Sequence, residues 1–320
     1  MSTASIDTHT PIYVAGHRGM VGSAILRTLN RDGYTNLITR TSDELDLRDQ
    51  QQVNTFFSQT RPEVVILAAA RVGGILANNE YPYQFIRDNL TLQNNVIHAA
   101  HQYGTERLIF LGSSCIYPRE VRQPIREDSL LTGPLEATNE WYAVAKIAGL
   151  KMCQALRRQY GRCYFSLMPT NLYGPNDNFD LKTSHVLPAL IRKFHEALPD
   201  KEVNLWGTGS PLREFLHVDD LAGAVVHFLH HQPGHDFYNI GTGKDLSIYE
   251  LSELIREITG HTGKVNWDTS KPDGTPRKLL DITRVKETGW SPSISLRQGI
   301  EDTYNWFKSN KSHLKEVHIE

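Results

Sequence analysis

A cluster of glycines between an apolar run and an amphipathic segment constrains the fold more than any other feature of this sequence. The cluster is Gly16, Gly19 and Gly22, spaced G-x-x-G-x-x-G rather than G-x-G-x-x-G. It follows the apolar run 12–15 and precedes the segment 20–30, whose apolar residues recur at helical spacing. Glycines at a strand-to-helix turn let the backbone approach a pyrophosphate at the positive end of the helix. The arrangement therefore predicts the first unit of a nucleotide-binding domain.

Strand and helix patterns alternate through the first half of the chain. We expect strands at 12–15, 36–40, 64–70, 107–111 and 163–168, and helices at 20–30, 51–60, 82–103 and 139–160. Strands that alternate with helices pair in parallel through crossovers. The sequence therefore predicts an α/β protein with a Rossmann-type, doubly wound parallel sheet.

The pattern loosens after about residue 170, where Pro and Gly cluster at 174–177 and 207–211. Shorter helices are expected at 185–198, 218–230, 247–259 and 296–309, and a strand at 236–241 is expected to return to the sheet. A length of 320 residues suggests two domains. We predict a nucleotide-binding Rossmann domain over residues 1–172, interleaved with a smaller C-terminal α/β substrate domain over 173–320.

Charge and cysteine content restrict the classes of partner and compartment. The 34 Lys and Arg nearly balance the 36 Asp and Glu, so we expect neither nucleic acid nor a membrane surface as partner. Three cysteines in 320 residues favour a reducing, cytoplasmic compartment. The densest apolar run, 64–70, has the length of a strand, and residues 1–10 are expected to be a frayed leader rather than a signal peptide.

The end of the second predicted strand indicates which nucleotide binds. An acidic residue there would bind a ribose 2′-hydroxyl, but this chain has Arg40. Arg18, inside the glycine turn, adds a second guanidinium that can hold a 2′-phosphate. The sequence therefore predicts NADP(H) rather than NAD; the alternative is that one of these arginines is an ordinary surface residue.

Tyr142 and Lys146 form a Y-x-x-x-K pair on one face of a predicted helix. A neighbouring ammonium is expected to lower the pKa of the tyrosine, which can then exchange a proton with a carbonyl or alcohol. Such a pair alone is often only a helix surface. Ser113 follows the strand 107–111, at the sheet edge where ligands bind, and its hydroxyl can hold the same substrate oxygen.

These features resemble the extended short-chain dehydrogenase/reductase superfamily, and longer segments narrow the resemblance to the GDP-L-fucose synthase family. The segments are 15–24, 71–75, 111–118, 168–174, 213–220 and 271–281, and the likeness runs from about residue 12 to about residue 307. The resemblance implies an enzyme that epimerises GDP-4-keto-6-deoxy-D-mannose at C3 and C5 and then reduces its 4-keto group with NADPH. It also implies a homodimer formed through the helices 82–103 and 139–160.

The resemblance assigns the site residue by residue. It implies an NADP(H) site lined by Gly16, His17, Arg18, Gly19, Met20, Val21, Gly22, Arg40, Thr41, Ser42, Asp43, Glu44, Leu45, Leu111, Gly112, Ser113, Ser114, Tyr142, Lys146, Pro169, Thr170, Asn171, Leu172 and His185. Tyr142 would be the reductase acid, supported by Ser113 and Lys146, and Cys115 and His185 would be the epimerisation acid/base pair. The GDP-sugar would be held by Lys193, Trp206, Arg213 and Asp281. No metal site is predicted.

Two residues in this assignment have ordinary alternatives. Cys115 can be a small buried hydrophobe, and His185 can only cap or pack against a helix. A thiol and an imidazole have pKa values suited to exchanging the protons on the two carbons that flank a ketone. The sequence does not assign either group to C3 or C5. Lys193 stands where some family members have Arg, so the diphosphate would lose a bidentate partner.

Other functions remain to be weighed. A 4,6-dehydratase of this superfamily would carry carboxylates where Ser114, Cys115 and Ile116 stand. A 4-epimerase would retain NAD and would not favour Arg40. A non-catalytic NADP-binding sensor or scaffold would be expected to have lost Ser113, Tyr142 and Lys146, which are all present.

Overall fold

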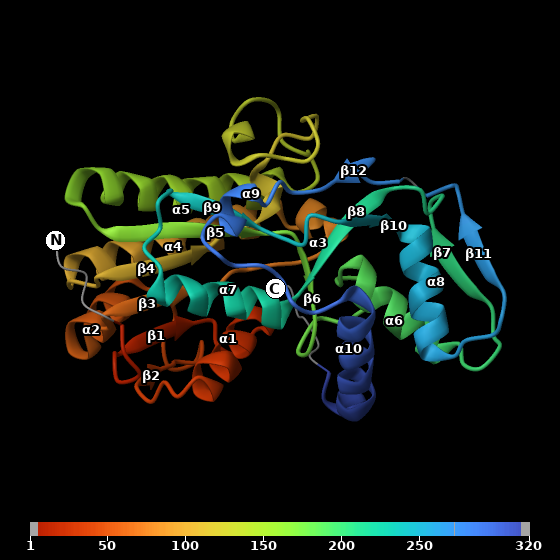
Figure 1. Ribbon diagram of the computed structural model, residues 1–320, viewed down its shortest axis with the longest axis horizontal. Helices are drawn as coiled ribbons and strands as arrows, with labels where there is room; N and C mark the ends of the chain where they lie inside the picture. The colour runs from red at the N-terminus through yellow and green to blue at the C-terminus, as the bar shows by residue number, and fades with distance from the viewer. Residues whose placement is uncertain (1–5, 272, 315–320) are drawn as a thin grey trace.

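A six-stranded parallel sheet with helices on both faces forms the larger part of the molecule (Figure 1). The computed structural model describes residues 6–271 and 273–314, so residues 1–5 of the expected leader and Pro272 lie outside the described residues. The strand order is β2-β1-β3-β4-β5-β9. The strands are β1 (Ile12–Ala15), β2 (Leu37–Ile38), β3 (Val64–Leu67), β4 (Arg107–Leu111), β5 (Cys163–Pro169) and β9 (Phe237–Ile240). The predicted fold class is confirmed.

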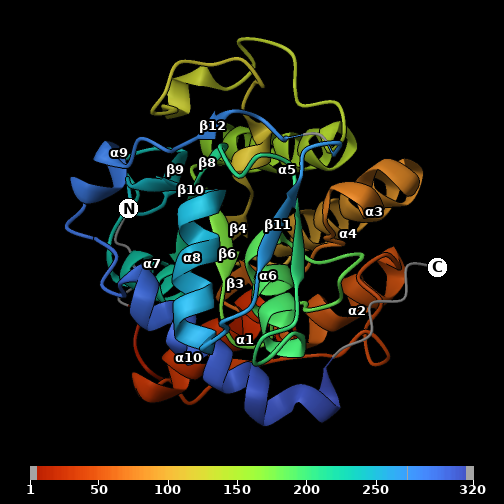
Figure 2. The same ribbon diagram turned by 90° about the vertical axis from the view of Figure 1, so that its right-hand side faces the viewer.

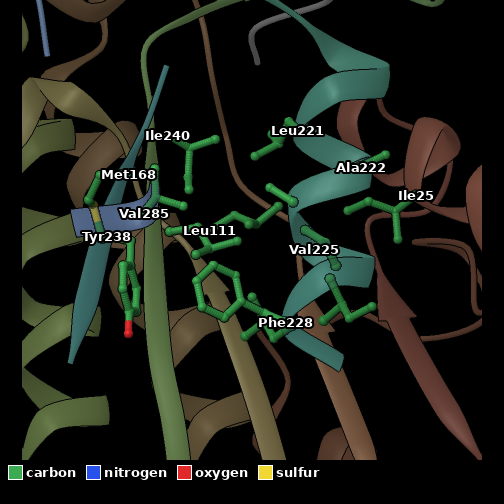
Figure 3. Close-up of a cluster of buried hydrophobic side chains, with 14 of the residues drawn as sticks. Ile25, Leu111, Met168, Leu221, Ala222, Val225, Phe228, Tyr238, Ile240 and Val285 are labelled. Atoms are coloured by element: carbon green, nitrogen blue, oxygen red, sulfur yellow. The ribbon is translucent and has the colours of Figure 1, made fainter. Parts of the chain in front are cut away.

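Alternation along these strands sends side chains to two separate cores. On one face, Ile109 and Phe165 pack beneath α1 (Met20–Arg31) and α7 (Val218–His230). Figure 3 shows Leu111 of β4, Phe228 of α7 and Ile25 of α1 in this cluster. On the other face, the strands pack beneath α2 (Gln50–Thr60), α4 (Pro82–Gln102) and α5 (Glu140–Tyr160). Both faces of the sheet are therefore covered, which explains why β3 is apolar throughout.

A smaller group of strands and helices extends from the carboxyl ends of this sheet, and Figure 2 views the molecule from its side. One small sheet has the order β10-β8-β12, with β6 also pairing with β8, and β7 pairs in parallel with β11. Its elements are β6 (Asn171–Tyr173), α6 (Val186–Glu196), β7 (Val203–Trp206), β8 (Leu212–His217), β10 (Asp245–Ser247), α8 (Ile248–Thr259), β11 (Val265–Asp268), β12 (Arg277–Lys278) and α10 (Leu296–Asn310). A third core, which includes Phe179, Phe194 and Phe307, holds this group together.

The structure differs from the sequence-based expectations mainly in short elements. Each predicted helix is present within about two residues of its expected ends, and the strand expected at 236–241 is β9, beside β5. The second strand is only Leu37–Ile38 rather than 36–40, and the third ends at Leu67 rather than at residue 70. The sequence did not predict α3 (Ile75–Glu80), α9 (Thr283–Lys286) or the short strands of the smaller group. Within the described residues, no helix is both long and apolar enough to cross a membrane.

Candidate active site

The glycine turn after β1 is packed too tightly for a side chain at two positions. Gly16 has a φ of +83°, and a Cβ there would lie 2.6 Å from the backbone nitrogen of Ala69, two residues after β3. A Cβ on Gly22 would lie 2.2 Å from the carbonyl oxygen of Gly16. Gly19 caps α1 without any side-chain hydrogen bond, and the first turn of α1 has no acidic residue. The positive end of α1 is therefore left open at the sheet edge, as binding of a diphosphate requires.

Arg18 and Arg40 lie near the same carboxylate, that of Glu44. The backbone N–H of Thr41 donates a 2.7 Å hydrogen bond to this carboxylate. That bond is the main reason why the pKa of Glu44 is lowered, and the charges of Arg40 and Arg18 lower it further. The Arg40 guanidinium also lies 5.5 Å from the ring centre of Phe56. The structure thus brings the two predicted cations together beside the turn 41–45.

The other predicted cofactor residues follow the carboxyl ends of β4 and β5. A Cβ on Gly112 would lie 2.3 Å from the sulfur of Met168, so the Met168 side chain packs directly against this glycine. Just after β5, the Thr170 hydroxyl and the Asn171 amide both donate to the carbonyl oxygen of Glu214, at 3.2 Å and 2.8 Å. Residues 111–114 and 169–172 therefore lie at adjacent strand ends, on the same edge of the sheet as the glycine turn.

Tyr142 and Lys146 lie in the first turns of α5, above the end of β4. The Lys146 ammonium donates a 2.9 Å hydrogen bond to the carbonyl oxygen of Leu111 and lies 5.6 Å from the centre of the Tyr142 ring. Burial lowers the pKa of Lys146 to about 7. Burial also raises the pKa of Tyr142, and the electrostatic influence of the nearby Cys115 adds to this. The expected lowering of the tyrosine pKa is therefore not observed, because burial outweighs a lysine that points at Leu111.

The Cys115 sulfur has two nitrogen donors that the sequence did not predict. The Asn139 amide nitrogen lies 3.6 Å from Sγ and the Lys278 ammonium lies 3.7 Å from it. The backbone N–H of Cys115 donates to the Ser113 hydroxyl at 3.2 Å. Asn139 comes immediately before α5, three residues from Tyr142, and Lys278 ends β12. The position of Asn139 at the start of the predicted helix was the available signal; Lys278 had only its place within the segment 271–281.

His185 is the capping residue of α6, and its side chain is exposed. Desolvation by the surrounding protein lowers the pKa of His185, and the positive charge of Lys278 lowers it further. Lys278 is therefore a common neighbour of Cys115 and His185, two residues that are 70 positions apart in the sequence. The structure gathers the two around one cation.

The residues predicted to hold a sugar nucleotide are divided among three elements and the loop before α9. The Lys193 ammonium on α6 lies 5.7 Å from the ring centre of Trp206, which ends β7 and is 57% exposed. Arg213 on β8 is half-buried and faces Lys278 in the register of β8 and β12. The Asp281 carboxylate accepts a 2.8 Å hydrogen bond from the backbone N–H of Thr283. Lys193 and Trp206 are thus brought together, and Arg213 lies beside the strand that carries Lys278.

Comparisons with known proteins agree over nearly the whole chain. Residues 12–241 match the family described as the NAD dependent epimerase/dehydratase family. The chain is 58% identical over 306 residues to GDP-L-fucose synthase 1 of Arabidopsis thaliana, covering 95% of each chain. It is 52% identical over 315 residues to GDP-L-fucose synthase of Escherichia coli K12, covering 95% of this chain and 98% of the other.

Solved structures give the same result. The crystal structure of a GDP-L-fucose synthetase from Naegleria fowleri bound to NADP superposes with a TM-score of 0.90 at 27% sequence identity. The match covers 98% of this chain and 96% of that one. The similarity therefore includes the smaller group of elements as well as the parallel sheet.

Proposed function

The chain belongs to the NAD-dependent epimerase/dehydratase family and, within it, to the GDP-L-fucose synthases, and from this membership we propose its reaction. It converts GDP-4-keto-6-deoxy-D-mannose to GDP-L-fucose by epimerisation at C3 and C5, followed by reduction of the 4-keto group. The proposal rests on one observation: Cys115 lies close to the Tyr142–Lys146 pair above the end of β4. A 4,6-dehydratase is disfavoured, because η1 (Ser114–Ile116) offers no carboxylate at this position.

The cofactor is NADP(H), and the residues of the glycine turn fit it. A side chain at Gly16 or Gly22 would fill the turn. Because both residues are glycines, the backbone of the turn is free to approach the diphosphate above the open end of α1. Arg18 and Arg40 would hold the 2′-phosphate, since both already lie beside an anionic group. Residues 41–45, 111–114 and 169–172, with Tyr142, Lys146 and His185, would line the remainder. When bound, NADPH supplies the hydride that reduces C4.

Tyr142 is proposed as the proton donor for the reduction. Because its pKa is raised, its hydroxyl is protonated at neutral pH, as a proton donor must be. The Ser113 hydroxyl would hold the same C4 oxygen. Lys146 is proposed to hold the Tyr142 side chain in place, because a hydrogen bond to the Leu111 carbonyl oxygen fixes the position of the Lys146 ammonium.

Cys115 and His185 are proposed as the acid/base pair of the epimerisation. One group removes the proton from C3 or C5, and the C–H electron pair moves toward the C4 carbonyl oxygen to form an enolate. The other group returns a proton to the opposite face of the same carbon, and the ketone re-forms. Neither inversion changes the oxidation state of the sugar, so only the final step consumes NADPH.

Four residues of the smaller group are proposed to hold the GDP-sugar. Trp206 offers an exposed ring and Lys193 an adjacent ammonium, suited to a base and a diphosphate. Arg213 and Asp281 would bind the part of the substrate nearer β12. On this proposal residues 1–172, completed by β9, hold NADP(H), and residues 173–320 hold the substrate.

We also propose a homodimer in a reducing, cytoplasmic compartment. Tyr83 on α4 and Trp141 on α5 are 64% and 44% exposed, which leaves apolar surface on the two helices expected to pair. All three cysteines are free, as in a chain kept reduced. A mass measurement by light scattering at micromolar concentration tests the dimer, and a monomeric mass rejects it.

Identification of the product tests the proposed function directly. The protein is incubated with NADPH and GDP-4-keto-6-deoxy-D-mannose, and the product sugar is identified by NMR. GDP-L-fucose is the expected product. A 4-reduced sugar that retains the original configuration at C3 and C5 would reject the epimerase part and leave the reductase part.

A further inference from the structure

We propose that Lys278 is a positioning residue of the epimerisation site, whose ammonium holds the Cys115 sulfur as a thiolate. The inference rests on the proposed function, because it concerns the group assigned there to proton exchange. It goes further, in that neither the sequence nor the resemblance gave Lys278 a role. Three observations support it: the donors around the sulfur, the absence of a competing carboxylate, and the fixed backbone on both sides of Lys278.

The two side chains beside the Cys115 sulfur both present N–H groups to it. The Lys278 ammonium at 3.7 Å has three donors and no acceptor, so it cannot receive a hydrogen bond from a thiol. The Asn139 amide nitrogen at 3.6 Å also donates. A sulfur that faces two donors is satisfied as an acceptor, and a thiolate is a far better acceptor than a thiol. The two neighbours thus offer the contacts that an anionic sulfur would accept.

The charge of Lys278 is not neutralised by a carboxylate. Among the described residues no Asp or Glu forms an ion pair with it, whereas the preceding residue, Arg277, is paired with Asp245 at 2.6 Å. Among the described residues, Lys278 from β12 and Tyr142 from α5 are ionisable groups that interact with Cys115, and Lys278 also acts on His185 at the start of α6. With Tyr142 protonated, Lys278 is a cation within reach of an anion that forms on the sulfur.

Strand geometry directs Lys278 toward the sulfur. Successive residues of a strand point to opposite faces, so Arg277 faces solvent and Asp245 while Lys278 faces the site. The backbone is held on both sides of Lys278. Leu212 N–H donates to the Pro276 carbonyl at 2.8 Å, and Leu279 N–H donates to the Gln123 side chain at 2.9 Å. The ammonium is therefore positioned before any substrate binds.

The proposed step conserves protons and electrons. The Cys115 thiolate takes the proton from the carbon beside the ketone and becomes a thiol, and the C–H electron pair moves into the carbonyl to give an enolate. His185 in its imidazolium form returns a proton to the other face and becomes neutral imidazole, and the enolate electrons form the new C–H bond. Exchange with solvent then moves a proton from the Cys115 thiol back to His185. Lys278 keeps its three protons throughout. It stabilises the thiolate before the step, and it stabilises it again once Cys115 has lost the proton that it took from carbon.

The first experiment measures the charge state of Cys115 without any substrate. The full-length protein is alkylated with iodoacetamide at a series of pH values, and the modified Cys115 peptide is quantified by mass spectrometry. In Lys278→Met the half-point of the alkylation curve should rise by about one pH unit or more, since an opposite charge at this distance has been removed. Alkylation at pH 7 should then be about tenfold slower. Lys278→Arg, which keeps the charge, should restore much of the rate.

Arg277→Met is the matched control, because it removes a cation one residue away that points to the opposite face. Its alkylation curve should coincide with that of the wild type. An unchanged curve in Lys278→Met overturns the proposal, and so does an equal change in both variants. Unaltered affinity for NADPH shows that each variant has kept its fold.

The second experiment separates this proposal from the proposed function. Exchange of solvent deuterium into C3 and C5 of GDP-4-keto-6-deoxy-D-mannose is followed without NADPH. Lys278→Met should exchange at least tenfold more slowly than wild type, with kcat for exchange falling more than KM rises. No exchange in the wild type would reject the epimerase function, while a shifted alkylation curve would still support the charge relation between Lys278 and Cys115.

Discussion

The backbone N–H of Gly74 donates a 2.9 Å hydrogen bond to the carbonyl oxygen of Thr183, two residues before His185. A Cβ on Gly74 would lie 2.9 Å from the carbonyl oxygen of Ser184 and 3.1 Å from that of Thr183. The loop after β3 therefore lies directly against the segment that carries His185 into α6. The position of this imidazole depends on the absence of a side chain at Gly74.

Gly74→Ala should weaken epimerisation selectively. The added methyl group must displace residues 183–184, and a shift of about 1 Å at a catalytic group costs on the order of 100-fold in rate. We expect deuterium exchange at C3 and C5 to fall by about 10- to 100-fold, with NADPH affinity unchanged. Gly223→Ala is the control, because its nearest neighbour, Trp290, lies 4.0 Å from the added carbon. An equal loss in both variants would count against the prediction.

Substitution of the proposed acids should separate the two activities. Tyr142→Phe removes the proton donor for C4, so NADPH oxidation should fall by ~10²–10⁴-fold while deuterium exchange remains measurable. Cys115→Ser replaces the thiol with a far weaker acid, so exchange should fall while NADPH binds normally. Exchange at the wild-type rate in Cys115→Ser would show that the thiol is structural.

The two arginines near Glu44 should set the preference for NADPH. Charge-assisted hydrogen bonds to a 2′-phosphate contribute about 1.5–3 kcal/mol each, roughly 10- to 100-fold in kcat/KM. Arg40→Ala should lose about this factor with NADPH and little with NADH. Arg31→Ala removes an exposed arginine that pairs with Asp32 and serves as the control. Equal use of NADPH and NADH by the wild type would reject the assignment.

Lys146 should make the rate of the reduction depend on pH near neutrality. Its pKa is lowered to about 7 by burial, so it is charged below this pH and neutral above it. If the ammonium form supports Tyr142, the single-turnover rate of NADPH oxidation falls as pH rises through about 7. Lys146→Arg stays charged and should lose that pH dependence even if its maximal rate is lower. A flat wild-type profile between pH 6 and 9 contradicts this prediction.

Asp177→Asn should stabilise the protein at alkaline pH. Asp177 is 7% exposed, its Oδ2 has no partner among the described residues, and burial raises its pKa to about 7. Because the folded pKa exceeds the ordinary value of 3.8, stability is lost as pH rises through about 7. Asparagine keeps an oxygen for the Asn178 N–H and cannot ionise. Its free energy of unfolding should exceed that of the wild type by about 1 kcal/mol or more at pH 8, and by less at pH 5. Urea unfolding at the two pH values provides the measurement.

The parallel sheet could be predicted because its signals are local. The run 64–67 is apolar, as burial on both faces requires, and the helices of the first half have amphipathic periodicity and clear ends. β12 has only the two residues Arg277 and Lys278, and its place is set by pairing with β8, more than 60 residues earlier. No pattern of two residues can indicate such a partner. The small sheet therefore could not be predicted from the sequence and is seen only in the structure.

The same reasoning applies within the site. Ser113, Tyr142 and Lys146 could be proposed from spacing, because one strand end and one helix face carry them. Asn139 and Lys278 approach the Cys115 sulfur from two further places along the chain, through contacts that only the folded chain creates. The direction of the Tyr142 pKa was also not predictable from a neighbouring lysine, since burial decides it.

The position of β9 at the outer edge of the large sheet bears on how this enzyme can be dissected. A fragment ending at residue 172 would lose both β9 and α7, leaving β5 with unpaired backbone groups and Phe165 without its cover of Phe228. An exposed apolar edge of this kind is a template for aggregation. The remaining fragment would carry β9 with no strand to join. Split reporters or fusions that divide the protein after residue 172 should therefore give two insoluble fragments. This holds both for the fragment with the NADP(H)-binding residues and for the fragment with the substrate-binding residues.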